Sequence, residues 1–83
     1  MSLTVEQLAA AVESVMPEVV KIRRHLHQHP ELSGEEEKTA SLVAESCEIL
    51  GLKVRQNIGG HGLLVTLKVD ENRPWIAFRA DMD

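Results

Sequence analysis

The sequence predicts an α/β fold whose order within these residues is that of an α+β protein, with two helices followed by about three strands. Apolar residues recur at helical spacing from Val5 to Leu26 and again from Ala40 to Leu50. After Gly51 the apolar period changes from about 3.6 to about two. The 83 residues, of which 43% are hydrophobic and 27% charged, suffice for at most one small domain with a modest core.

The first predicted helix begins near Thr4 and ends near His29. Its apolar stripe has spacings of three and four and consists of Val5, Leu8, Val12, Val15, Val19, Ile22 and Leu26. Thr4 and Gln7 have the spacing of a capping box, which satisfies free N–H groups of the first turn. Pro17 lacks a backbone N–H and predicts a kink or a restart. Pro30 disfavours helical geometry at His29, so the helix must end there.

The second predicted helix begins near Ser33. Ser33 and Glu36 have the spacing of another capping box, and the run Glu35–Glu37 places negative charge where a helix N-terminus favours it. Gly51 is suited to the left-handed cap just after the helix. The helix has apolar residues at helical spacing, which are Ala40, Val43, Cys47 and Leu50.

Three strands are expected after this helix. The first contains Leu52, Val54 and Ile58, with Gln56 breaking the alternation, and a glycine-rich turn at residues 59–62 follows it. The second, residues 63–69, alternates so that one face lies in a core. After a polar turn at residues 70–74, the third, residues 75–78, is expected to be buried on both faces.

Composition excludes several classes of function. The net charge is -4 and Trp75 and Phe78 are the two aromatic residues, which argues against nucleic-acid binding. The single cysteine, Cys47, cannot form an internal disulfide. No membrane-spanning run and no signal peptide are evident, so we expect a cytoplasmic protein.

Two groups of histidine and glutamate residues invite a functional interpretation, but a structural one is favoured for both. His25 and His29 share one helix face and are suited to a metal ion, yet last-turn histidines also interact with the helix dipole, and no third ligand is near. His27 lies on another face and is expected to pack against the core and bond a backbone carbonyl. The run Glu35–Glu37 is interpreted as a solvated helix N-terminus without a catalytic role.

Cys47 and the glycine turn are also interpreted as structural. Cys47 lies at a core-facing position, where a thiol behaves as a small apolar group. The Gly59–Gly62 stretch lacks the lysine and the following helix of a phosphate-binding loop, so a hairpin turn is favoured.

Asp81 and Asp83 follow directly after the third predicted strand, at the sheet end where active sites gather. Their spacing leaves three roles open: orienting a histidine, binding a metal, or capping a following helix. Arg79 can pair with either. Because the chain stops at this edge, we expect a fragment of a longer protein rather than a complete small domain.

Two blocks of the sequence resemble the N-terminal signature of a metallopeptidase-like family of amidohydrolases. The first block is residues 22–33, IRRHLHQHPELS, and the second is residues 78–83, FRADMD, with Glu36, Thr39, Ala40, Leu50, Gly51 and Gly62 between them. The family contains N-acyl-amino-acid amidohydrolases, hippurate hydrolases and the auxin-conjugate hydrolases of plants. The resemblance implies that residues 1–83 are the incomplete N-terminal portion of a zinc-peptidase-like catalytic domain with a mixed sheet.

The resemblance also implies how the whole enzyme works. Two divalent metal ions, manganese or zinc, activate a water that attacks an amide carbonyl, with a glutamate as general base. The substrates are N-acylated amino acids or short peptides, and a separate inserted domain, absent from this chain, makes the enzyme a homodimer.

Few of the family's functional residues fall within this chain. Arg79 stands where the wider superfamily often has a metal-binding histidine, so we expect no metal ligand here and assign Asp81 a supporting, orienting role. The resemblance assigns His27, Pro30 and Glu31 to the turn between the two helices. Since the metal ligands and the catalytic glutamate come from other segments, the chain alone is expected to bind no metal and to be inactive.

Two alternatives from other classes remain. One is a non-catalytic module that docks on a partner, or on itself, through an exposed strand edge. The other is a small regulatory domain that binds metal through His25 and His29.

Overall fold

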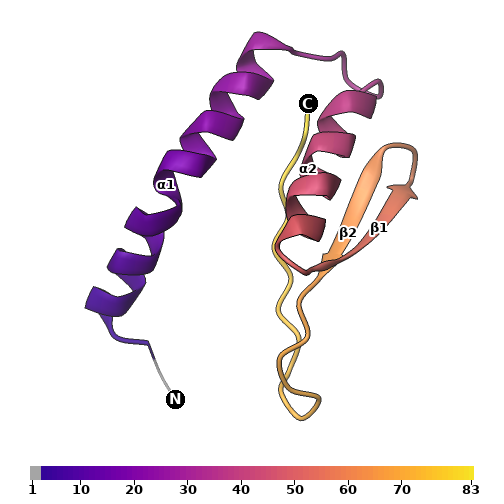
Figure 1. Ribbon diagram of the computed structural model, residues 1–83. Helices are drawn as coiled ribbons and strands as arrows, with labels where there is room; N and C mark the ends of the chain where they lie inside the picture. The colour runs from indigo at the N-terminus through magenta and orange to yellow at the C-terminus, as the bar shows by residue number, and fades with distance from the viewer. Residues whose placement is uncertain (1–2) are drawn as a thin grey trace. The chain divides into compact units, whose positions relative to one another are not determined.

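The computed structural model describes residues 3–83 and contains two helices and one β-hairpin (Figure 1). In chain order they are α1 (Val5–Gln28), α2 (Glu37–Ile49), β1 (Lys53–Ile58) and β2 (Gly62–Thr66). The chain divides into two compact units, Met1–Pro30 and Glu31–Asp83. The predicted α+β order is confirmed, with two strands in the described residues.

Helix α1 has the predicted N-terminal cap. The backbone N–H of Gln7 donates to Thr4 Oγ1 at 3.1 Å, and the N–H of Thr4 donates to Gln7 Oε1 at 2.9 Å. The helix continues through Pro17 as one element, so the alternative of a restart there is not observed. It ends at Gln28 with His29 as its C-cap, as Pro30 predicts. No helix among residues 3–83 is long and apolar enough to cross a membrane.

Helix α2 begins later than predicted. Its N-cap is Glu36, whose side chain makes no capping hydrogen bond to the helix. The expected Ser33–Glu36 capping box is therefore wrong. The end of α2 agrees with the prediction, because Gly51 follows the C-cap with φ +82°, a left-handed conformation that glycine adopts without steric cost.

Strands β1 and β2 form an antiparallel hairpin with an irregular register. Lys53 pairs with Thr66 and Arg55 with Leu64, but the next pair is Ile58 with Gly62. Two residues of β1, Gln56 and Asn57, thus oppose one residue of β2, which is a β-bulge. This bulge explains why Gln56 breaks the alternation of apolar and polar residues along the strand.

The small core of the second unit lies where α2 packs against the hairpin. Ala40 and Ala44, one helical turn apart, are its buried hydrophobic residues. Their short side chains let the helix axis come close to the strands. Val43, Cys47 and Val54 are half-buried around them, so the predicted core-facing position of Cys47 agrees with the structure.

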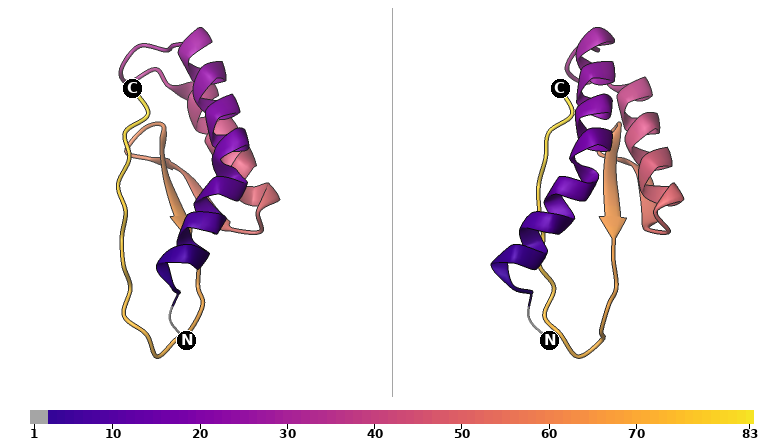
Figure 2. Two further views of the ribbon diagram at one scale, coloured as in Figure 1. Left: turned by 90° about the vertical axis from the view of Figure 1, so that its left-hand side faces the viewer. Right: turned by 60° about the vertical axis from the view of Figure 1, so that its left-hand side comes forward.

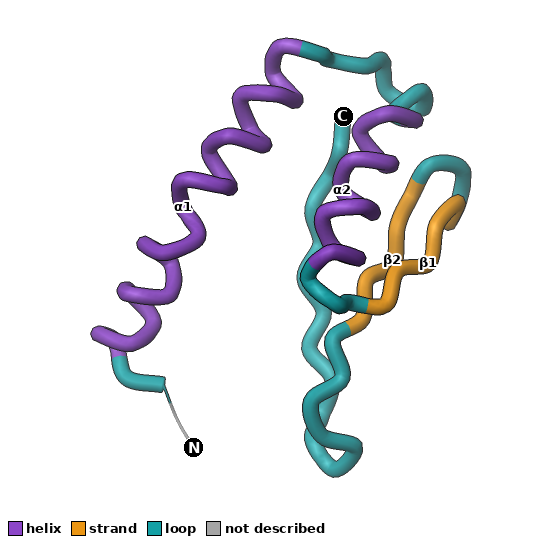
Figure 3. The backbone as a smooth tube through the Cα atoms, viewed as in Figure 1, coloured by secondary structure: helices purple, strands orange, loops and turns teal. Residues whose placement is uncertain are grey.

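The third predicted strand is not confirmed. After β2 the chain makes a long loop that leaves the hairpin and returns toward the glycine turn at its end (Figures 2 and 3). Trp75, Ile76 and Phe78 are 69%, 78% and 96% exposed, the opposite of the burial that their apolar character predicts. A strand requires a neighbour to bond its backbone, and none of the described residues pairs with this segment. The core face predicted for residues 63–69 is likewise limited, because Leu67 and Val69 are exposed.

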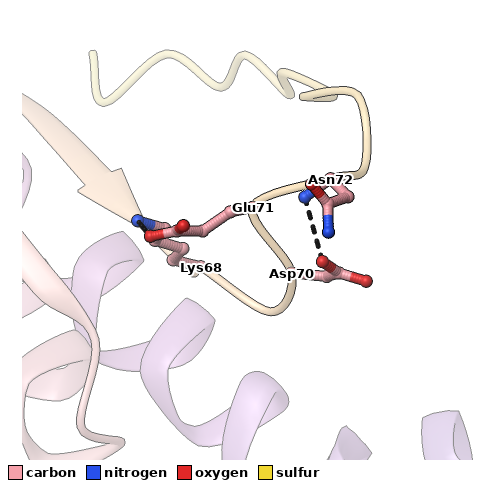
Figure 4. Close-up of polar contacts among 4 residues, drawn as sticks. All are labelled: Lys68, Asp70, Glu71 and Asn72. Carbon is pink, nitrogen blue, oxygen red and sulfur yellow. Dashed lines mark hydrogen bonds and ion pairs between the residues drawn. The ribbon is translucent and has the colours of Figure 1, made fainter.

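The predicted turn at residues 70–74 is present and is organised by polar contacts (Figure 4). The backbone N–H of Asn72 donates to Asp70 Oδ1 at 2.9 Å, which is an Asx turn. Lys68 Nζ lies 2.7 Å from Glu71 Oε1 in an exposed ion pair. These local bonds reverse the chain direction after β2.

We predict that Gly62→Ala weakens the hairpin by about 1–3 kcal/mol. A Cβ at this position overlaps the backbone carbonyl oxygen of Ile58, so the strands must move apart. Thermal unfolding followed by circular dichroism measures the loss. The matched control is Gly59→Asn, because position 59 has φ +61° and open space around a new Cβ, and asparagine tolerates that conformation. Equal stability of Gly62→Ala and the parent chain would contradict the prediction.

Candidate functional site

Glu31 is the residue that organises the loop between α1 and α2, residues 31–36, which we call the 31–36 loop. Its Oε1 accepts hydrogen bonds from the backbone N–H and the Oγ1 of Thr39, both at 2.7 Å. Its Oε2 accepts the backbone N–H of Lys38 at 3.1 Å. Helix N-termini have free N–H groups that need such acceptors. A carboxylate eight residues before Thr39 therefore caps α2 in place of the predicted Ser33.

These bonds lower the pKa of the Glu31 carboxyl below its ordinary value. The main cause is the hydrogen bond from the Thr39 hydroxyl, followed by the bond from the Thr39 backbone N–H. Donors that bond the ionised form favour that form. Glu31 therefore caps α2 as an ionised carboxylate at neutral pH.

The 31–36 loop is closed by a second carboxylate. Glu36 Oε1 accepts the backbone N–H of Gly34 at 2.8 Å, and Gly34 has φ +86°. Glu36 is buried, with 9% of its surface exposed. The interpretation of the Glu35–Glu37 run as a solvated face is therefore wrong for Glu36, because its side chain turns back into the loop that precedes the helix.

The end of the chain lies beside this loop. Ser33 Oγ donates to Asp83 Oδ2 at 3.3 Å, a contact between residues fifty positions apart. Arg79 Nη2 lies 3.2 Å from Asp81 Oδ1, and both side chains are largely exposed, at 89% and 67%. Exposed pairs of this kind contribute about 0–1 kcal/mol, so this one orients Asp81 more than it stabilises the fold.

A hollow of about 300 Å³ lies between three segments of the second unit. The segments are the 31–36 loop, the glycine turn and the last four residues. The lining residues are Gly34, Glu36, Ile58, Gly59, Gly60, His61, Gly62, Ala80, Asp81, Met82 and Asp83. Asp81 and Asp83 thus share a cavity with the glycine turn at residues 59–62, which the sequence analysis interpreted as a structural hairpin turn. We call this cavity the Asp81–Asp83 hollow.

The Asp81–Asp83 hollow has polar groups but not the ligand set of a metal centre. Three of its titratable side chains already have partners: Glu36 bonds Gly34, Asp83 bonds Ser33, and Asp81 pairs with Arg79. Among residues 3–83 no group of three or more histidine, cysteine, aspartate or glutamate side chains is placed to hold a metal ion. The described residues therefore do not fit a two-metal site, and they supply carboxylates at the edge of a polar cavity.

The structure brings some of the predicted site residues together and separates others. Glu31 lies in the 31–36 loop and Asp81 in the hollow, with Arg79 beside it. The expectation that His27 packs against a core and bonds a backbone carbonyl is wrong, because His27 is exposed in the last turn of α1 and no side-chain hydrogen bond joins it to another residue between 3 and 83. The roles that the family resemblance assigns to Asp81, His27, Pro30 and Arg79 stay predictions.

Sequence reasoning missed the contributions of Ser33, Glu36 and the glycine turn to this cavity. Ser33 and Glu36 do have capping-box spacing, and that local signal suggested the wrong partners for both side chains. The contact between Ser33 and Asp83 joins distant parts of the chain and leaves no periodic pattern in the sequence.

Known proteins that match this chain carry the names of hydrolases, including amidohydrolases and carboxypeptidases. YhaA of Bacillus subtilis, which carries an amidohydrolase name, is 42% identical over 78 residues, or 94% of this chain and 20% of its own length. Thermostable carboxypeptidase 2 of Saccharolobus solfataricus is 40% identical, over 95% of this chain and 20% of its own. The N-acyl-L-amino acid amidohydrolase of Geobacillus stearothermophilus is 37% identical, over 98% and 22%.

Further relatives include a hippurate hydrolase of Campylobacter jejuni and an IAA-amino acid hydrolase of Arabidopsis thaliana. The predicted resemblance is confirmed: the chain is a relative of these amidohydrolases along nearly its whole length. It spans about a fifth of the length of the curated relatives named above. No family model matches the chain, and no solved structure matches it.

We predict that Glu31→Gln removes a pH-dependent part of the stability of the second unit. Because the folded-state pKa of Glu31 is lowered, its contribution is present above the ordinary glutamate pKa of about 4.3 and is lost as the pH falls through the folded value. Urea unfolding between pH 3 and pH 7 measures this contribution. The difference in unfolding free energy between the parent chain and Glu31→Gln should be largest near pH 7 and shrink below pH ~4.3.

The matched control for this prediction is Glu35→Gln, in the same loop. The Glu35 side chain makes no hydrogen bond to another residue of the described range, 3–83. A pH-independent difference for Glu31→Gln, or an equal pH-dependent difference for Glu35→Gln, would contradict the capping role.

Proposed function

We propose that this chain forms the N-terminal part of the catalytic domain of a metal-dependent amidohydrolase. The substrates of the whole enzyme are N-acyl amino acids or short peptides. The observation that carries the proposal is the identity of 37–42% to an amidohydrolase-named protein and an N-acyl-L-amino acid amidohydrolase, over 94–98% of this chain. Names among the other relatives, hippurate hydrolase and N-acetyl-L-cysteine deacetylase, indicate the same substrate class.

Exposed apolar surface supports the view that these residues pack against further polypeptide. Trp75, Ile76 and Phe78 are exposed in the second unit, and within the first unit the stripe of α1 is uncovered at Leu8, Val12 and Val19. Soluble proteins seldom expose contiguous apolar patches unless another surface covers them. The mixed sheet of a larger catalytic domain offers residues 75–78 the backbone partner that they need as a strand.

We assign the two divalent metal ions of the proposed enzyme, manganese or zinc, to ligands outside this chain. This assignment rests on the family resemblance. Asp81 is the positioning residue that we assign to this chain, because it borders the Asp81–Asp83 hollow and its carboxylate pairs with Arg79. A homodimeric state and a cytoplasmic location belong to the same proposal and rest on the sequence alone.

The exposed hairpin supports one second candidate, a non-catalytic module that docks through a strand edge. The sheet of the described residues has two strands, so each strand has one edge without a backbone partner. Light scattering that finds concentration-dependent dimers of this chain, together with inactivity of every longer protein that contains it, would favour docking over catalysis.

The proposed activity is tested by hydrolysis of hippurate and N-acetyl amino acids in the presence of manganese or zinc. We expect a longer protein that contains this sequence to release free amino acid, and the 83-residue chain alone to release none, because it lacks the metal ligands. Release of amino acid by the purified chain alone would overturn the proposed inactivity. Failure of the longer protein on every substrate of the class would overturn the proposed function.

We predict that Asp81→Asn in the active longer protein lowers kcat by about 10- to 100-fold, the range found when groups that orient metal ligands are changed. KM and the unfolding temperature should change little, because Asp81 is exposed and its ion pair contributes little to stability. Glu71→Gln is the matched control, since Glu71 is an exposed carboxylate with an ion pair and does not line the hollow. Parental kcat in Asp81→Asn would remove Asp81 from the active site.

A further inference from the structure

We propose that His25 and His29 form a surface binding site for a divalent transition-metal ion, of the class Cu²⁺, Ni²⁺ and Zn²⁺. The pair lies at the C-terminal end of α1, in a different unit from the Asp81–Asp83 hollow. It takes no part in the proposed hydrolysis. The sequence alone favoured a structural role for the two residues, and the separation of their rings is that of two ligands of one metal ion.

The separation of the two imidazole rings suits a shared metal ion. Their centroids are 4.7 Å apart and the ring planes are tilted by 44°. A metal bonded to a ring nitrogen at about 2.0–2.1 Å lies roughly 3.2 Å from that ring's centre, so two rings that share it at angles of about 90–110° have centres about 4.5–5.2 Å apart. The observed separation falls within this range.

The backbone holds the two histidines in place before any metal arrives. The N–H of His29 donates to the carbonyl oxygen of His25 at 3.1 Å and to that of Leu26 at 3.3 Å. Pro30 further restricts the conformation of His29. A pair of ligands that is already positioned loses less conformational entropy when it binds, which raises the affinity.

Charges near the pair act in both directions. The last carbonyl groups of α1 form the negative end of the helix dipole and attract a cation. Lys21 lies one turn before His25, and its positive charge repels a metal cation at the pair. Since both histidines are exposed and residues 3–83 offer no third protein ligand, water fills the remaining coordination positions. The bound metal is therefore open to solvent and can exchange with metal in solution.

The ligand type determines the class of metal. Neutral imidazole suits copper, nickel and zinc, whereas Mg²⁺ and Ca²⁺ prefer oxygen ligands. Among divalent ions Cu²⁺ binds such ligands most tightly. The rival explanation of the geometry is that the rings only stack on each other, which also places aromatic centroids at this separation.

Nuclear magnetic resonance of the histidine rings in the 83-residue chain distinguishes the two explanations. With substoichiometric Ni²⁺, we expect the ring signals of His25 and His29 to broaden together, while those of His27 and His61 persist. Equal broadening of all four histidines, broadening of only one of the pair, or no broadening would overturn the proposal.

Calorimetric titration with Ni²⁺ gives an independent test. His25→Asn and His29→Asn should each weaken binding by about tenfold or more, because the second ligand no longer binds intramolecularly. His27→Asn, in the same turn but on another face, is the matched control and should change the affinity by less than about twofold. Circular dichroism verifies that each variant keeps its helix content. Equal losses in all three variants, or retained affinity in His25→Asn, would show that no two-histidine site exists.

Discussion

The Glu31 carboxylate holds the first turn of α2, and the candidate site depends on this contact. Three hydrogen bonds, from the backbone N–H groups of Lys38 and Thr39 and from the Thr39 hydroxyl, end on its two oxygens. They satisfy donors that every helix N-terminus leaves free. Because Glu31 supplies the cap, the side chains of Ser33 and Glu36 can form hydrogen bonds elsewhere.

Those contacts build the Asp81–Asp83 hollow. Glu36 closes the 31–36 loop on Gly34, and Ser33 reaches Asp83 at the far end of the chain. The hairpin turn contributes Gly59–Gly62 to the lining of the hollow. Gly62 lies so close to the Ile58 carbonyl oxygen that a Cβ at this position would overlap it. A helix cap, a glycine turn and a chain end thus place two aspartates beside one polar cavity.

The second unit has a very small core for the surface that it exposes. Ala40 and Ala44 are its buried hydrophobic residues, while Trp75 and Phe78 remain exposed. Apolar surface of this kind stabilises a fold only when it is removed from water. This imbalance, and relatives about five times as long as the chain, agree with the proposal that these residues pack within a larger hydrolase domain.

Residue type and spacing were sufficient to predict the local elements: both helices, the capping box at Thr4, the end of α1 before Pro30, the left-handed Gly51 and the hairpin of β1 and β2. Each depends on neighbours within a few residues, so spacing and residue type are sufficient to predict it. The two blocks around Pro30 and Asp81 also identified the relatives correctly. The identity of the carboxylate that caps α2, the partners of Ser33 and Glu36, and the absence of a strand at residues 75–78 could be seen only in the folded chain. Those outcomes depend on contacts between distant residues, or on a strand partner, and neither produces a periodic signal along the chain.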